Sequence, residues 1–112
     1  MRKKIVAGNW KMNKSWPEAM ELVKALTSNS TTFPADVKVI IAPPALYLQG
    51  LLAELPSSIA IAAQNCSQHE SGAFTGEISS GMLKSMNVHF SIIGHSERRQ
   101  YYGETNDIIR EK

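Results

Sequence analysis

The sequence predicts an α/β fold built on a parallel sheet, and two observations carry the prediction. Four short apolar runs begin near residues 5, 37, 59 and 88 of the 112-residue chain, and each is typical of a strand. A segment with helix-start signals follows each run, so strands and helices alternate. This order is typical of parallel strands joined by right-handed crossovers. Four such strands fit either an open sheet or part of a closed barrel.

Composition narrows the class of protein. An apolar share of 43% is enough to form the core of one domain. A net charge of +2 gives no reason to expect nucleic-acid binding, and no apolar run approaches the length of a membrane span. Only three apolar residues follow the basic N-terminus, too few for a signal peptide. The single Cys66 fits a reducing compartment, so we expect a cytoplasmic location.

Residues 5–10 predict the first strand. Period-two alternation continues past its end and places Asn9 and Lys11 on one side, so an amide and an ammonium share a face at the strand's carboxyl end. Ser15 and Glu18 then form a capping box that begins a helix. Apolar residues recur at helical spacing along it, which predicts a packed face (Trp16, Ala19, Met20, Val23 and Leu26).

Residues 37–42 predict the second strand, which is almost continuously apolar, as buried parallel strands are. Pro43 and Pro44 end this strand and can start the next helix, and Pro56 stops that helix. Four leucines form its apolar stripe (Leu48, Leu51, Leu52 and Leu55). Residues 59–63 predict a short third strand.

The polar segment Gln64 to Gly76 interrupts this rhythm. A loop of this length inside a compact unit is usually functional or disordered. Phe74 near its tip is an exposed apolar anchor unless something covers it, although the segment also fits a mobile surface loop. Ser79 or Ser80 then caps a short helix that runs to Met86.

Residues 88–93 predict the fourth strand, and His95 follows where this strand gives way to a helix. In parallel α/β folds this edge of the sheet carries the chemistry. Ser96 and Glu97 suit the first turn of the helix, whose positive end disfavours an imidazolium. We therefore expect a neutral His95 that donates a hydrogen bond, although a capping histidine beside a surface ion cluster fits equally well. Another helix begins at Thr105, and its interruption at the end of the sequence favours part of a barrel over an open sheet.

Three segments, residues 7–13, 72–79 and 93–99, resemble the triosephosphate isomerase family in order and spacing. The resemblance covers residues 3–112, about the first half of a barrel of ~250 residues. It implies a (β/α)8 TIM barrel, of which residues 1–112 are the N-terminal half and hold βα units 1–4, the last helix incomplete. A neutral histidine is also what this resemblance implies, so the two arguments are not independent.

The resemblance implies an isomerase that interconverts dihydroxyacetone phosphate and D-glyceraldehyde 3-phosphate through an enediolate, in glycolysis and gluconeogenesis, without cofactor or metal. Asn9 would hydrogen-bond near the developing oxyanion, and Lys11 would offer positive charge to the substrate. His95 would polarise the carbonyl group and shuttle protons. Ser96 and Glu97 would support these groups, with Glu97 holding Lys11.

The resemblance also implies a homodimer formed through the Gln64 to Gly76 loop. Phe74 and Thr75 would enter a pocket of the second subunit, and Arg98 would meet the partner subunit's Glu77. His69 and His89 lack partners at metal-ligand spacing, so we expect packing or surface roles for them.

The family's catalytic base is a glutamate that lies beyond residue 112, so the 112 residues alone are expected to be inactive. Two alternatives stay open: a non-catalytic half-barrel used as a folding or assembly scaffold, and another phosphate-binding barrel. The combination of Asn9, Lys11 and His95 argues against the second alternative.

Overall fold

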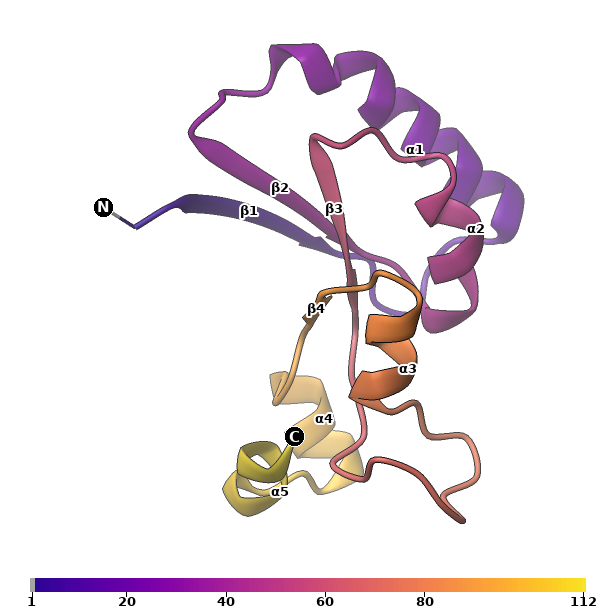
Figure 1. Ribbon diagram of the computed structural model, residues 1–112, viewed down its shortest axis with the longest axis vertical. Coiled ribbons are helices and arrows are strands. Elements are labelled where there is room, and N and C mark those ends of the chain that lie inside the picture. Colours follow the sequence, from indigo (N-terminus) through magenta and orange to yellow (C-terminus); the bar gives the residue numbers. More distant parts are fainter. Residues whose placement is uncertain (1) are drawn as a thin grey trace.

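The computed structural model describes residues 2–112 and contains one parallel sheet that curves like half of a barrel (Figure 1). Its strands are neighbours in chain order, β1 (Lys4–Asn9), β2 (Val37–Ala42), β3 (Ile59–Ala63) and β4 (Phe90–Ser91). All three pairings are parallel. The carboxyl ends of the four strands therefore meet at one edge, as the predicted fold class requires.

The helices confirm the predicted alternation. Each of the first three strands is followed by a helix on the outer face of the sheet: α1 (Trp16–Asn29), α2 (Leu48–Leu52) and α3 (Ser80–Ser85) (Figure 1). Two short helices, α4 (Ser96–Tyr102) and α5 (Asn106–Glu111), follow β4. Single 3-10 turns, η1 (Ser30–Thr32) and η2 (Ala45–Tyr47), come after α1 and before α2. Within the described residues, no helix is long and apolar enough to cross a membrane.

The helix starts agree with the capping signals. Ser15 and Glu18 form the capping box of α1, in which the Ser15 N–H donates to the Glu18 carboxylate at 2.8 Å. The Ser79 hydroxyl accepts from the Met82 N–H at 3.2 Å and begins α3. The Thr105 hydroxyl accepts from the Ile108 N–H in the same way and begins α5. Local sequence therefore determines where these helices begin.

Two predicted elements are longer than the structure allows. Strand β4 covers Phe90–Ser91 instead of residues 88–93, because it pairs with Ala62 and Ala63, the last two residues of β3, and the Val88 N–H donates to the Leu83 carbonyl instead of to a strand. The leucine-rich helix ends at Leu52, and its first turn is the 3-10 turn η2 that follows Pro44. Leu55 therefore packs against the core from a turn.

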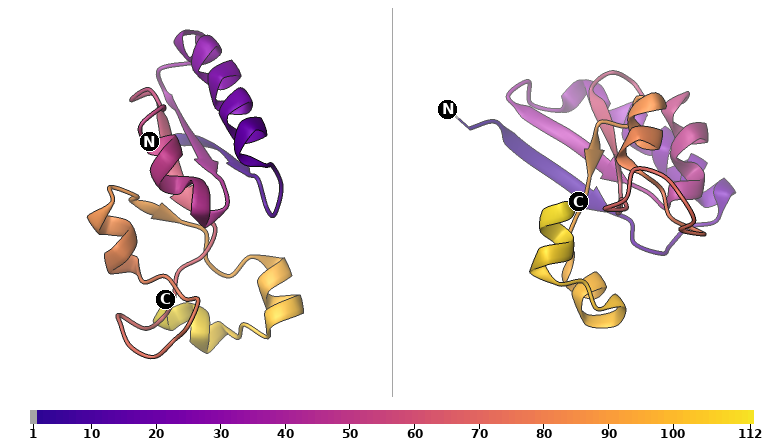
Figure 2. Two further views of the ribbon diagram at one scale, coloured as in Figure 1. Left: turned by 90° about the vertical axis from the view of Figure 1, so that its right-hand side faces the viewer. Right: turned by 60° about the horizontal axis from the view of Figure 1, so that its bottom comes forward.

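The core lies between the sheet and its helices, where Ala19 of α1 and Leu51 of α2 are fully buried. The opposite, inner face carries a smaller cluster around Ile40. Within residues 2–112 no helix covers this inner face, as the further views show (Figure 2). Strand β1 lies at an edge of the sheet and is exposed on both faces, with Ile5 at 57% and Val6 at 60% of their full exposure.

Candidate active site

The chain leaves β1 at Asn9 and makes a strained turn at Lys11. Lys11 has φ +56°, a left-handed conformation that residues with side chains seldom adopt. Its N–H donates to Asn9 Oδ1 at 2.9 Å, and its carbonyl accepts from Gln64 Nε2 at 2.7 Å. Strained backbone of this kind is concentrated at functional sites.

The Lys11 ammonium reaches across the edge of the sheet to α4. Its Nζ lies 2.6 Å from Glu97 Oε1, so the expected contact between these two residues is present. The hydrogen bond from Lys11 lowers the pKa of the Glu97 carboxyl below its ordinary value. Because both side chains are about half exposed, this pair adds little stability, and its effect is to orient the ammonium.

His95 is the N-cap residue of α4. Its Nδ1 accepts a hydrogen bond from the Glu97 N–H at 3.1 Å and lies 3.7 Å from Glu97 Oε2. An accepting Nδ1 carries no proton, so the neutral ring holds its proton on Nε2. Gly94 makes the turn from β4 into this helix with φ +68°, a conformation that suits glycine. At this edge of the sheet, Lys11 is thus hydrogen-bonded to Asn9 through its backbone and to Glu97 through its ammonium, and Glu97 is hydrogen-bonded to His95.

Comparisons with known proteins show the family of the chain. The family model for triosephosphate isomerase matches residues 4–112. The chain belongs to the triosephosphate isomerase family. A triosephosphate isomerase of Cytophaga hutchinsonii is 49% identical over 113 aligned positions, which cover 100% of this chain and 45% of the relative. Those of Porphyromonas gingivalis and Acetivibrio thermocellus are 47% and 49% identical, covering 100% and 99% of this chain. The chain spans less than half the length of these relatives.

The loop expected to join subunits in this family projects from the site edge. Phe74 is 42% exposed, and its ring stacks on His69 with 3.7 Å between ring centres. The Phe74 N–H donates to the Gly72 carbonyl and the Glu77 N–H to the Phe74 carbonyl, so the tip is a defined turn. Thr75 and Glu77 are exposed. The packing role expected for His69 is therefore a contact within the loop, and the role of the loop as a dimer contact stays a prediction.

Arg98 has a partner within the chain. Its Nε donates to Glu104 Oε2 at 2.7 Å, and its guanidinium lies 4.8 Å from the centre of the Tyr102 ring. The expected contact with the partner subunit's Glu77 stays a prediction. Ser96, the first residue of α4, is exposed.

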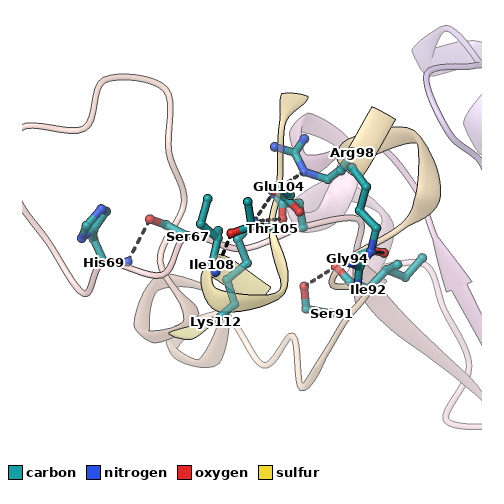
Figure 3. Close-up of polar contacts among 12 residues, drawn as sticks. Ser67, His69, Ser91, Ile92, Gly94, Arg98, Glu104, Thr105, Ile108 and Lys112 are labelled. Carbon is teal, nitrogen blue, oxygen red and sulfur yellow. Dashed lines mark hydrogen bonds and ion pairs between the residues drawn. The ribbon is translucent and has the colours of Figure 1, made fainter. Parts of the chain in front are cut away.

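Sequence reasoning missed a buried charged cluster beside the site (Figure 3). Glu104 is 8% exposed, and its Oε2 accepts from Arg98 and also from Lys112 Nζ at 2.5 Å. Lys112 Nζ donates to Asn65 Oδ1 at 2.7 Å as well. No local signal identifies this cluster, because Glu104 and Lys112 have the pattern of exposed residues near helix ends.

Gln64 was also missed, although a signal for it exists. It is the first polar residue after the buried strand β3, at the edge where site residues gather. Among residues 2–112, no group of three or more histidine, cysteine, aspartate or glutamate side chains could hold a metal ion.

Proposed function

We propose that the protein interconverts dihydroxyacetone phosphate and D-glyceraldehyde 3-phosphate, and that residues 1–112 supply the electrophilic part of its active site. A chain of hydrogen bonds supports this proposal: Asn9 accepts from the Lys11 N–H, the Lys11 ammonium donates to Glu97, and the Glu97 N–H donates to His95. Enediolate formation needs fixed donors aimed at the developing negative charge. In the proposal, Lys11 offers an ammonium to the substrate oxygens, and His95 offers its Nε2–H to the carbonyl oxygen. Asn9 Oδ1 is occupied by the Lys11 N–H, so its amide NH₂ is the group left to donate.

The proton on the substrate carbon would be removed by a carboxylate outside residues 1–112. Glu97 is a poor candidate for this base, because its carboxylate is bound to the Lys11 ammonium and has a lowered pKa. In this proposal the protein works in glycolysis and gluconeogenesis in the cytoplasm, where the buried Cys66 stays reduced. It needs no cofactor or metal.

A hybrid protein tests the proposal. In this hybrid, residues 1–112 replace the matching segment of the Cytophaga hutchinsonii relative, which supplies the rest of the barrel. We expect triosephosphate isomerase turnover in a coupled assay. Lys11→Ala and His95→Ala should each lower kcat/KM by about 10²–10³-fold, as losses of fixed electrostatic groups do. Lys14→Ala, on the same loop, is the matched control and should stay near the parent value.

A folded hybrid without turnover would contradict the proposed function and favour the non-catalytic scaffold. Equal losses for Lys14→Ala and Lys11→Ala would also contradict it, since the loop would then matter only as structure. Circular dichroism of each variant distinguishes an unfolded protein from a folded protein that has lost activity.

His95 in the hybrid should be neutral with its proton on Nε2, because the Glu97 N–H donates to Nδ1. The ring ¹⁵N chemical shifts measure this directly. We expect a pyridine-type Nδ1 and a pyrrole-type Nε2 at neutral pH. Two pyrrole-type nitrogens at neutral pH would contradict the assignment.

The Gln64 to Gly76 loop should hold two copies of the hybrid together. Phe74→Gly with Thr75→Asp removes an exposed apolar anchor and adds a charge, so the dimer dissociation constant should rise by about 30-fold or more, which corresponds to a lost hot spot of about 2 kcal/mol. Analytical ultracentrifugation over a concentration series measures this change. Ser71→Asp adds the same charge to the loop beside the tip and should change the dimer dissociation constant much less. Unchanged association of the double variant would count against the dimer loop.

A further inference from the structure

The turn between β1 and α1 contains two left-handed lysines, Lys11 with φ +56° and Lys14 with φ +79°. A lysine adopts this conformation only when its surroundings hold it there. A side chain from another βα unit donates to the carbonyl of each one. Gln64 Nε2 donates to the Lys11 carbonyl at 2.7 Å, and the Tyr47 hydroxyl donates to the Lys14 carbonyl at 2.7 Å. Two side chains thus brace one strained loop.

Gln64 also ties the loop to the sheet. Its Nε2 donates to the Ala42 carbonyl at 2.9 Å, at the end of β2, and the same carbonyl accepts from the Trp10 N–H at 3.0 Å. Both partners of the amide are carbonyl oxygens, so its NH₂ group must face them. Gln64 therefore connects the carboxyl ends of β1, β2 and β3 through one amide group.

Hydrogen bonds, and not packing, hold Lys11 in place. Its side chain is 51% exposed, so few neighbours restrict it. Asn9 accepts from its N–H, Gln64 donates to its carbonyl, and Glu97 accepts from its ammonium. The Gln64 amide holds the peptide after Lys11, so we expect its loss to let this peptide rotate out of the left-handed region and redirect the side chain.

We propose that Gln64 is a positioning residue for Lys11, which holds the strained backbone so that the ammonium reaches the substrate site. This inference deepens the proposed function, and the expected change in KM rests on that function. Gln64 acts through the Lys11 carbonyl. Tyr47 performs the same task for Lys14, which has no part in the proposed chemistry, and so provides a matched comparison.

The kinetic test compares Gln64→Leu with Tyr47→Phe in the hybrid. Each variant removes side-chain donation to one left-handed lysine and keeps a similar shape, and Gln64→Leu also removes the donation to the Ala42 carbonyl. Gln64→Leu should raise KM about tenfold with a smaller change in kcat, because it misplaces a group that binds the substrate. Tyr47→Phe should leave KM within about twofold, although both variants should lower the melting temperature. Equal changes in KM for the two variants would overturn the proposal.

Crystal structures of the same variants provide a readout that does not depend on turnover. In Gln64→Leu, Lys11 should leave the left-handed region and its Nζ should leave Glu97, whereas Tyr47→Phe should preserve both features. A left-handed Lys11 still paired with Glu97 in Gln64→Leu would overturn the proposal, even if KM rose. If the parent hybrid folds without turnover, the proposed function fails, and the Lys11 conformation still decides the inference. Should Gln64→Leu not fold, Gln64→Asn, whose amide is one methylene shorter, is expected to change Lys11 in the same direction.

Discussion

The purified 112-residue chain should show no isomerase turnover above the buffer rate. Proton abstraction next to a carbonyl needs a positioned base, and general acid–base catalysis contributes roughly 10²–10⁴-fold. Within residues 2–112, the carboxylate at the proposed site is that of Glu97, which Lys11 binds at 2.6 Å. A carboxylate with a lowered pKa that is already paired is a weak base. In the proposed mechanism, the remaining donors would stabilise an enediolate but would not form one.

The same chain should associate into larger species. β1 and β4 each have one partner strand, so the sheet of residues 2–112 has two edges, and unpaired edges favour pairing with another copy. Ile5 and Val6 on β1 expose more than half of their surface. A closed barrel would pair every strand and cover these residues. We therefore expect another copy to take the place of the missing neighbours.

A coupled isomerase assay with light scattering measures both expectations on one sample. The hybrid at equal concentration is the positive control for turnover and for a defined size. Val6→Lys places a charge on the exposed edge strand and should reduce association without restoring turnover. A stable monomer that turns over substrate would contradict the division of the active site proposed here.

The sequence predicts the order of the elements because their signals are local. Apolar runs mark β1, β2 and β3, and the polar residues Ser15, Ser79 and Thr105 cap the helices that were expected there. The length of β4 was predicted wrongly, because it depends on which residues of β3 lie opposite it. The register between two strands is a property of the assembled sheet, and the hydrophobic periodicity of the sequence does not predict it.

The site was predictable only where local sequence signals determine it. Period-two alternation is valid to Asn9, where β1 ends, and a left-handed turn beyond it determines where Lys11 points. The junction at His95 was readable from residues on either side of it. Gln64 acts on a carbonyl 53 positions away, and Lys112 on Asn65 47 positions away, so folding alone brings them together.

Glu104→Ala in the hybrid should be strongly destabilising. Glu104 is 8% exposed, and its loss leaves the Lys112 ammonium, whose side chain is 2% exposed, without its carboxylate. Removing one partner of a buried ion pair costs about 3–5 kcal/mol, because the other charge stays buried. Asp107→Ala is the control, since its pair with Arg110 is highly exposed and such pairs contribute at most about 1 kcal/mol. Urea unfolding followed by tryptophan fluorescence at a fixed protein concentration measures both.

The effect of Glu104 should depend on pH in a defined direction. Burial raises the pKa of its carboxyl, but hydrogen bonds from Lys112 and Arg98 outweigh burial and hold the pKa below its ordinary value of 4.5. A pKa that is lowered on folding stabilises the folded state above the unfolded value, and this stabilisation disappears as the pH falls through the folded value. The stability difference between the parent hybrid and Glu104→Ala should therefore be constant near neutral pH and shrink below about 4.5. A difference that stays unchanged down to the acid limit of folding would show that Glu104 acts through packing and not through its charge.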